Sequence, residues 1–151
     1  MFGGYFMYYT VSEIAKKMDV NASTLRYYDK EGLLPFVERS RGGIRMFKES
    51  DIGMLDIIGC LKQTGMSIKD IKSFVDYYKT GDTDFANRIK ILDNQKASVL
   101  EQMESLQHNL DMLEYKKWYY QKAIELKSLS EVANLPVTDV PKKFHKFLII
   151  E

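Results

Sequence analysis

The chain has 151 residues, of which 45% are hydrophobic and 28% charged, and its formal net charge is +1. This composition excludes an intrinsically disordered protein, and no run approaches the ~18 consecutive apolar residues that a membrane-spanning helix needs. The single cysteine, Cys60, excludes an internal disulfide and agrees with a reducing compartment, so a cytoplasmic protein without a membrane partner is expected.

The positive charge is concentrated near the N-terminus. The first 48 residues contain eight Lys and Arg against five Asp and Glu, or +3, whereas the remainder contains fourteen against sixteen, or −2. This asymmetry favours an anion-binding surface in the N-terminal part. The opening MFGGYFMYYT carries no basic residue and is therefore not predicted to be a signal peptide.

Two short helices joined by a tight turn are predicted first. Thr10 and Glu13 have the spacing of a capping box and open a helix over residues 10–18. Asn21 is placed to cap a second helix, residues 22–31. The order helix, turn, helix is that of a helix-turn-helix unit.

The second helix has two different faces. On a wheel of ~100° per residue, Leu25 and Tyr28 fall on one side and are expected to pack against Ile14, Ala15 and Val20. The other side carries a hydroxyl, a guanidinium, a phenol and an ammonium group, from Ser23, Arg26, Tyr27 and Lys30. These donors suit phosphate oxygens and guanine edges, so this face is predicted to enter DNA; the alternative is an ordinary solvated surface.

A basic β-hairpin is predicted next. The run PFVERSRGGIRMF has two strand-like segments around Arg41-Gly42-Gly43. Arg39, Arg41 and Arg45 lie within it and are opposed only by Glu38. Such a hairpin beside a helix-turn-helix is predicted to be a wing that contacts neighbouring phosphates.

Two further helices and one long helix complete the pattern. A third helix is predicted from Glu49 to Gly65, and a fourth from a capping pair, Ser67 and Asp70, to Gly81. From residue 82 to 135 the chain contains neither Gly nor Pro, which indicates one long helix.

The long helix carries a regular apolar seam at every third and fourth position. A lone helix cannot bury such a seam, so dimerisation is favoured over the alternative of a helix folded back on its own domain. The predicted dimer interface contains Ile89, Leu92, Val99, Met103, Leu106, Leu110 and Leu113.

Taken together, these segments resemble the MerR family of bacterial transcription regulators. The likeness covers Tyr9 to about Tyr120 and rests on YTVSEIAKKMDV, STLRYYDKEGLL, GGIRMFKESDI, GMSIKDIK and the long helix. One departure lies in the wing, where many relatives have an aromatic on each side of the arginine and this chain has Ile44 and Phe47.

The resemblance implies a mainly α fold with a winged helix-turn-helix head and a long dimerisation helix that forms an antiparallel coiled coil. The expected domains are the head with its linker (8–81), the helix (82–127) and a C-terminal tail (128–151). The resemblance supports DNA contacts by Thr24, Arg26, Tyr27 and Arg45, with Ser12, Arg39 and Arg41 added from the same pattern.

The resemblance also implies a mechanism. Such homodimers bind a palindromic site in a promoter whose spacer is too long for RNA polymerase, and the activated dimer bends and untwists the DNA. An effector biases the two states of the dimer.

The nature of the effector is left open by the sequence. Beyond Lys127 only 24 residues remain, which is too short for a separate ligand-binding domain. The setting of Cys60 is similar to the aldehyde- and redox-responsive branch of the family, where a thiolate at this place is modified by an electrophile. The alternatives are a small buried Cys60, or a noncovalent small-molecule pocket at the dimer interface, built from Tyr77, Tyr78, Tyr115, Trp118, Tyr119 and Tyr120.

Other classes fit the sequence less well. One cysteine and two isolated histidines, His108 and His145, do not predict a metal site, and no cofactor is expected. No Ser-His-Asp, paired-carboxylate, P-loop or dinucleotide signature is present, so an enzyme is not predicted. A coiled-coil interaction protein without a DNA role stays open as an alternative.

Overall fold

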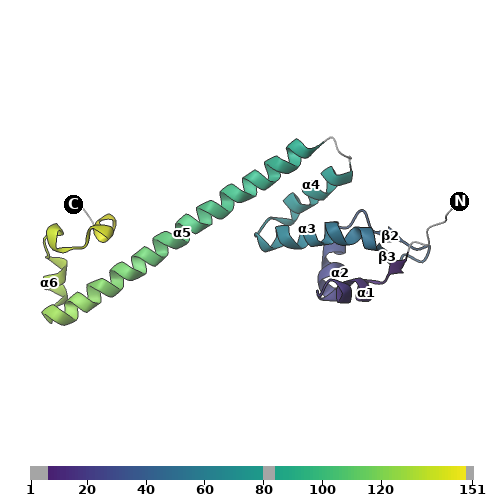
Figure 1. Cartoon of the computed structure of the whole chain (residues 1–151). Coiled ribbons are helices and arrows are strands. Elements are labelled where there is room, and N and C mark those ends of the chain that lie inside the picture. The colour runs from purple at the N-terminus through teal and green to yellow at the C-terminus, as the bar shows by residue number, and fades with distance from the viewer. Residues whose placement is uncertain (1–6, 80–83, 149–151) are drawn as a thin grey trace. The chain divides into compact units, whose positions relative to one another are not determined.

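The computed structural model describes residues 7–79 and 84–148 of the chain (Figure 1). The chain forms two compact units, Met1–Lys96 and Ala97–Glu151. The architecture is that predicted: a mainly helical protein with a winged helix-turn-helix head, a small antiparallel sheet and one long helix.

The helix-turn-helix is formed by α1 (Val11–Lys17) and α2 (Ala22–Lys30). The predicted capping box is present, because the Glu13 amide donates to Thr10 Oγ1 at 3.2 Å and the Thr10 amide donates to Glu13 Oε2 at 2.8 Å. Asn21 occupies the N-cap of α2 as expected, but its side chain makes no capping hydrogen bond.

The sheet contains one strand more than the predicted hairpin. The wing strands β2 (Glu38–Arg39) and β3 (Arg45–Lys48) pair in antiparallel fashion. The additional strand, β1 (Tyr8–Tyr9), pairs with the other edge of β3, which gives the order β1-β3-β2. The base of the wing is therefore held from both sides.

The rest of the first unit is helical. A 3₁₀ turn, η1 (Glu49–Asp51), leads into α3 (Ile52–Gln63), and α4 follows (Ile68–Lys79). Gly65 has a φ of +80°, a conformation that favours glycine, and it ends the α3 segment as predicted. The predicted end of α4 at Gly81 and the predicted domain boundary there lie outside the described residues.

The core of the first unit joins α1 to α4 and the sheet. Leu25 and Tyr28 of α2 are buried, as the helical wheel predicts, and pack with Ile14 and Ala15. Val20, also expected in this contact, lies in the turn after α1, is 39% exposed and lines the same groove as Leu25 and Tyr28. The other buried members of this core are Leu33, Leu34, Phe47, Met54, Leu55, Ile58, Leu61, Met66, Ile71, Phe74 and Val75.

The long helix α5 runs from Phe85 to Leu126, or 42 residues, and rises about 63 Å at ~1.5 Å per residue. It ends next to the expected boundary at residue 127, and not at residue 135, although neither Gly nor Pro lies between these positions. Lys127 adopts a φ of +55°, and Ser128 Oγ accepts from the Glu131 amide to cap the short helix α6 (Leu129–Ala133).

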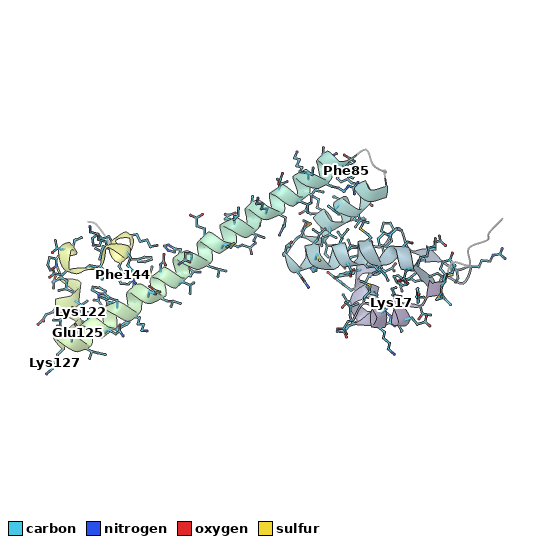
Figure 2. All side chains as sticks on the ribbon, in the orientation of Figure 1. Lys17, Phe85, Lys122, Glu125, Lys127 and Phe144 are labelled. Atoms are coloured by element: carbon cyan, nitrogen blue, oxygen red, sulfur yellow. The ribbon has the colours of Figure 1, made fainter. Side chains whose placement is uncertain are left out.

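The tail after α6 folds back onto α5 as two 3₁₀ helices, η2 (Val137–Asp139) and η3 (Lys142–Phe147). Figure 2 shows Phe144 on this segment, and its side chain is only 3% exposed. Burying one such side chain stabilises the fold by roughly 1.5–3 kcal/mol.

Among the helices that the structure describes, none is both long enough and apolar enough to cross a membrane.

Candidate nucleic-acid interface

One face of α2 is directed to solvent and carries the predicted polar set. Ser23, Arg26 and Lys30 are exposed and Tyr27 is 41% exposed, whereas Thr24 is half-buried. The two adjacent tyrosines therefore have separate roles, because Tyr28 is only 7% exposed and anchors the helix in the core. Ser12 is likewise exposed, in the first turn of α1.

The turn between α1 and α2 fixes the angle at which this face is presented. Asp19 takes a φ of +55°, and the Val20 amide donates to the Ala15 carbonyl at 3.0 Å. An aspartate tolerates this left-handed conformation better than most residues.

The wing is closed by a short turn. The Ser40 amide donates to the Ile44 carbonyl at 2.8 Å, and the Gly43 amide donates to the Ser40 carbonyl at 2.9 Å. Gly43 has a φ of +80°, which a residue with a Cβ adopts only under strain. Arg41 is exposed beside this turn, and Ile44 is 66% exposed.

Two of the three wing arginines contact the protein itself. Arg39 Nη2 donates to Asp29 Oδ2 at 2.9 Å, and Arg45 Nη2 donates to the same oxygen. Asp29 lies on α2, and its side chain is only 13% exposed. Hydrogen bonding from Arg45, with the charges of both arginines, lowers the pKa of Asp29. Sequence reasoning missed this residue, because it considered only Glu38 as the partner of the wing arginines.

Glu38 has a different role, at the base of the wing. It pairs with Lys48 and accepts a hydrogen bond from the Tyr8 hydroxyl at 3.0 Å. These contacts, the Lys48 bond first, lower the pKa of Glu38. The carboxylate thus links β1, β2 and β3. A second exposed ion pair, Lys17 Nζ to Glu49 Oε2 at 2.9 Å, joins the end of α1 to η1; Figure 2 labels Lys17.

The predicted seam of α5 is uncovered in the single chain. None of the α5 residues is fully buried, and the seam side chains are among the most exposed apolar groups of the protein. Exposed fractions are 57% for Ile89, 41% for Leu92, 60% for Met103, 63% for Leu106, 57% for Leu110 and 67% for Leu113, and Val99 is half-buried.

The C-terminal segment covers the other side of α5. Lys143 Nζ contacts Glu114 Oε2 at 3.1 Å, and Lys146 pairs with Asp111. Tyr115 stacks on Phe147 with ring centroids 5.5 Å apart. At ~100° per residue, Asp111 and Tyr115 lie roughly opposite the seam. The tail therefore leaves the apolar seam free.

The aromatic side chains near the end of α5 pack against the tail, and Trp118 and Phe144 also line an open groove of about 380 Å³. Tyr115 and Trp118 pack against Phe144, with centroid distances of 5.6 and 5.8 Å. The Tyr119 hydroxyl donates to the Leu129 carbonyl at 3.3 Å. Tyr120 is 58% exposed, and the side chain of Tyr78 lies outside the described residues. These contacts account for the cluster as packing of the tail.

Cys60 is exposed and lies in a groove between α2 and α3. It is therefore not the small buried hydrophobe of the alternative reading. The groove has a volume of about 400 Å³, and its lining includes Thr24 and Tyr28 of α2 together with Asp56 and Gln63 of α3. The thiol thus shares a cavity with the helix that carries the predicted DNA contacts.

No group of three or more His, Cys, Asp or Glu side chains gathers in an arrangement suited to a metal ion within residues 7–79 and 84–148.

Comparison with known proteins gives consistent matches. The family model "MerR HTH family regulatory protein" matches residues 9–78, and "MerR, DNA binding" matches residues 53–115. An uncharacterized HTH-type transcriptional regulator of Haemophilus influenzae is 46% identical over 130 residues, which cover 86% of this chain and 96% of the relative.

Two solved structures are similar along most of the chain. HiNmlR, a MerR family regulator lacking the sensor domain and bound to promoter DNA, is 46% identical with a TM-score of 0.60, covering 86% of this chain and 98% of that one. A MerR family regulator from Bacillus thuringiensis is 41% identical with a TM-score of 0.59, covering 73% and 96%.

Proposed function

The chain belongs to the MerR family of helix-turn-helix transcriptional regulators, which are DNA-binding proteins and not enzymes, and we propose that it binds a symmetric promoter site as a homodimer. The observation that carries the proposal is the exposed polar face of α2. This is the second helix of the helix-turn-helix, the one that such units insert into the major groove. The 46% identical relative bound to promoter DNA supports the same reading.

In this proposal Arg26 and Tyr27 of α2 reach base edges or phosphates, flanked by Ser23, Thr24 and Lys30. Ser12 lies at the start of α1, where amide groups and a hydroxyl suit a phosphate oxygen. Arg41 extends from the wing turn to an adjacent phosphate. Arg39 and Arg45, which the sequence predicted as DNA contacts, both pair with Asp29 in the structure, and their role is taken up below.

The dimer forms through the seam of α5, in the segment 82–127 proposed as the dimerisation domain. The seam positions alternate by four and three residues from Phe85 to Ile124, and this pattern is unchanged when the helix is reversed. An antiparallel pair centred between Met103 and Leu106 therefore places every seam residue opposite one of the partner. In this register Ile89 faces the partner's Tyr120.

The two lysines in the seam favour the antiparallel arrangement. In a parallel pair in register, Lys96 and Lys117 would each face their own copy, and like charges would be brought together at a desolvated interface. In the antiparallel register Lys117 instead faces the partner's Leu92, next to the partner's Asp93. The charge pattern thus opposes the parallel dimer.

The proposed output follows from bivalent binding. Two heads on one palindromic site bend and untwist the overlong spacer of the promoter, and this realigns the elements that RNA polymerase reads. The binding free energy of the two heads supplies the energy that deforms the DNA. A small change in the position of the heads therefore alters transcription without releasing the DNA.

The DNA-binding proposal is tested by selecting duplexes from a random pool with the purified chain. The expected outcome is enrichment of an inverted repeat, called here the selected duplex, that binds two chains and loses affinity steeply with salt. Failure to enrich any symmetric sequence would contradict the proposal and favour a coiled-coil interaction protein without a DNA role.

We further propose that the effector is an electrophile that reacts with Cys60. The thiolate Sγ adds to the carbonyl carbon of an aldehyde, a C–S bond forms, and the carbonyl oxygen takes up a proton to give a hemithioacetal. The adduct grows into the groove lined by Thr24 and Tyr28. It therefore displaces the α2 helix relative to α3.

Replacing Cys60 with serine is expected to leave the affinity for the selected duplex within about twofold, since serine is similar in size and Cys60 is exposed. Activation of transcription in vitro by formaldehyde should be lost. Because Cys60 is the only cysteine, thiol labelling of the wild type reports on this site alone. Full activation of Cys60→Ser by formaldehyde would overturn the thiol mechanism and favour a noncovalent pocket.

A further inference from the structure

Asp29 belongs to α2, and its side chain pairs with Arg39 and Arg45 of the wing. It lies three residues after Arg26 and about 60° around the helix from it, and its side chain is only 13% exposed whereas Arg26 and Lys30 are exposed. A carboxylate so close to the proposed DNA surface repels phosphates and weakens binding. We therefore asked which favourable contribution to binding the same carboxylate makes. Its partners indicate that contribution.

A continuous set of hydrogen bonds runs from α2 to the tip of the wing. Asp29 Oδ2 accepts from Arg39 Nη2 at 2.9 Å, and Arg39 Nη1 donates to the Gly43 carbonyl at 3.0 Å. Gly43 is the residue with a φ of +80° in the wing turn. Through Arg39, the Asp29 carboxylate is therefore linked to the turn that carries Arg41 and Ile44.

The second arginine is enclosed as well. The side chain of Arg45 is 25% exposed, and its Nη2 donates to the same carboxylate oxygen. Its Nε is buried and has no hydrogen-bond partner in the part of the chain that the structure describes. Such a guanidinium is held by the protein on its inner edge and is poorly placed to form the fork-like pair with a phosphate.

We propose that Asp29 is a positioning residue that holds the wing at a fixed distance from α2, with Arg39 and Arg45 acting through Asp29 and not as direct phosphate contacts. This inference rests on the proposed DNA-binding function. Its consequence is that Arg41 is the wing arginine that faces DNA. The Asp29 cluster sets sequence specificity by requiring the DNA to accept helix and wing at one spacing.

Removing the charge of Asp29 and losing its positioning role are expected to change the affinity for the selected duplex in opposite directions. Replacing Asp29 with asparagine removes a negative charge, so simple electrostatics raises the affinity for any duplex. Loss of the fixed spacing lowers the affinity for the selected duplex only. For Asp29→Asn we expect at least tenfold weaker binding to the selected duplex, with binding to a scrambled duplex of the same composition unchanged or tighter.

The matched control is Glu31→Gln, which makes the same change of charge two residues further along the chain. It should alter the affinity for both duplexes in the same direction and leave their ratio within about twofold. If Asp29→Asn behaves like Glu31→Gln, the proposal is overturned. A wild-type protein that selects no duplex would instead reject the proposed function itself.

A second variant, Arg45→Gln, keeps the test valid if Asp29→Asn folds poorly. A direct phosphate contact in each head predicts that the slope of log affinity against log salt becomes shallower by about 1.8, because each contact contributes roughly 0.9. Positioning through Asp29 predicts a tenfold or greater loss on the selected duplex with an unchanged slope. A slope reduced by that amount would overturn the proposal.

Discussion

Replacing Arg26 with alanine is expected to reduce affinity for the selected duplex by roughly 30-fold to 10⁴-fold. A guanidinium contact to a base edge contributes about 1–3 kcal/mol of discrimination, and the homodimer loses it in both heads. Because Arg26 is exposed and the neighbouring Leu25 remains in the core, the fold is expected to be unaffected. Fluorescence anisotropy titrations on the selected and scrambled duplexes measure the effect.

The same titrations distinguish the kind of contact that Arg26 makes. A base contact predicts that the preference for the selected duplex collapses while the salt slope is retained. A phosphate contact predicts weaker binding to both duplexes and a shallower slope. Lys16 lies on α1 and is exposed, so Lys16→Ala serves as a charge-matched control outside the α2 face. Equal losses in Arg26→Ala and this control would contradict the assignment of α2 as the DNA-reading helix.

Replacing Leu106 with lysine is expected to convert the dimer into a monomer. Leu106 is 63% exposed in the single chain, so the change costs the protomer little. In the dimer it lies beside the two-fold axis, and two unpaired ammonium groups would be buried there at a cost of several kcal/mol each. Light scattering should then report the 17.6 kDa of one chain and not twice that mass.

Loss of the dimer also removes bivalent binding, and the affinity for the selected duplex should fall by at least 100-fold. Glu104→Gln is the matched control, since it adds the same unit of charge on an exposed position about 200° around α5 from Leu106. It should remain dimeric. A dimeric Leu106→Lys with unchanged DNA affinity would show that the seam is not the interface.

Local patterns predicted most of the head because its determinants are close in sequence. The capping box of Thr10 and Glu13 and the wing turn at Gly43 each depend on residues within a few positions of one another. The inward and outward assignment of Tyr28 and Tyr27 follows from helical periodicity alone and is confirmed by their exposures. Val20 differs from the expectation in that it lies in the turn after α1 and is 39% exposed, where it lines the same groove as Leu25 and Tyr28.

Features that depend on tertiary contact were not predictable in the same way. The strand β1 has only two residues, Tyr8–Tyr9, and it forms because β3 offers a free edge. The pairing of Asp29 with arginines ten and sixteen residues away depends on the wing folding over α2. The signal that the sequence offered for this cluster was an aspartate near the core-facing side of the second helix, followed by the three wing arginines.

The end of α5 is a similar case. Lys127 adopts the left-handed conformation that glycine usually supplies, so the composition carried no stop signal there. Ser128 then caps α6, and the tail returns to pack Phe144 against Trp118. Just before Lys127, the final residues of α5 include the ion pair of Lys122 and Glu125 at 2.7 Å; Figure 2 labels both residues.

Disulfide cross-linking tests the antiparallel dimer most directly. Cysteines are introduced at Ile89 and Tyr120 in a chain that also carries Cys60→Ser. The two sites are about 46 Å apart along one helix, so they cannot join within one chain. The proposed register predicts nearly complete conversion to a covalent dimer on mild oxidation, whereas the pair Ile89→Cys and Leu113→Cys, one heptad out of register, should cross-link poorly. A covalent dimer formed by Ile89→Cys alone would instead reveal parallel helices and contradict the account.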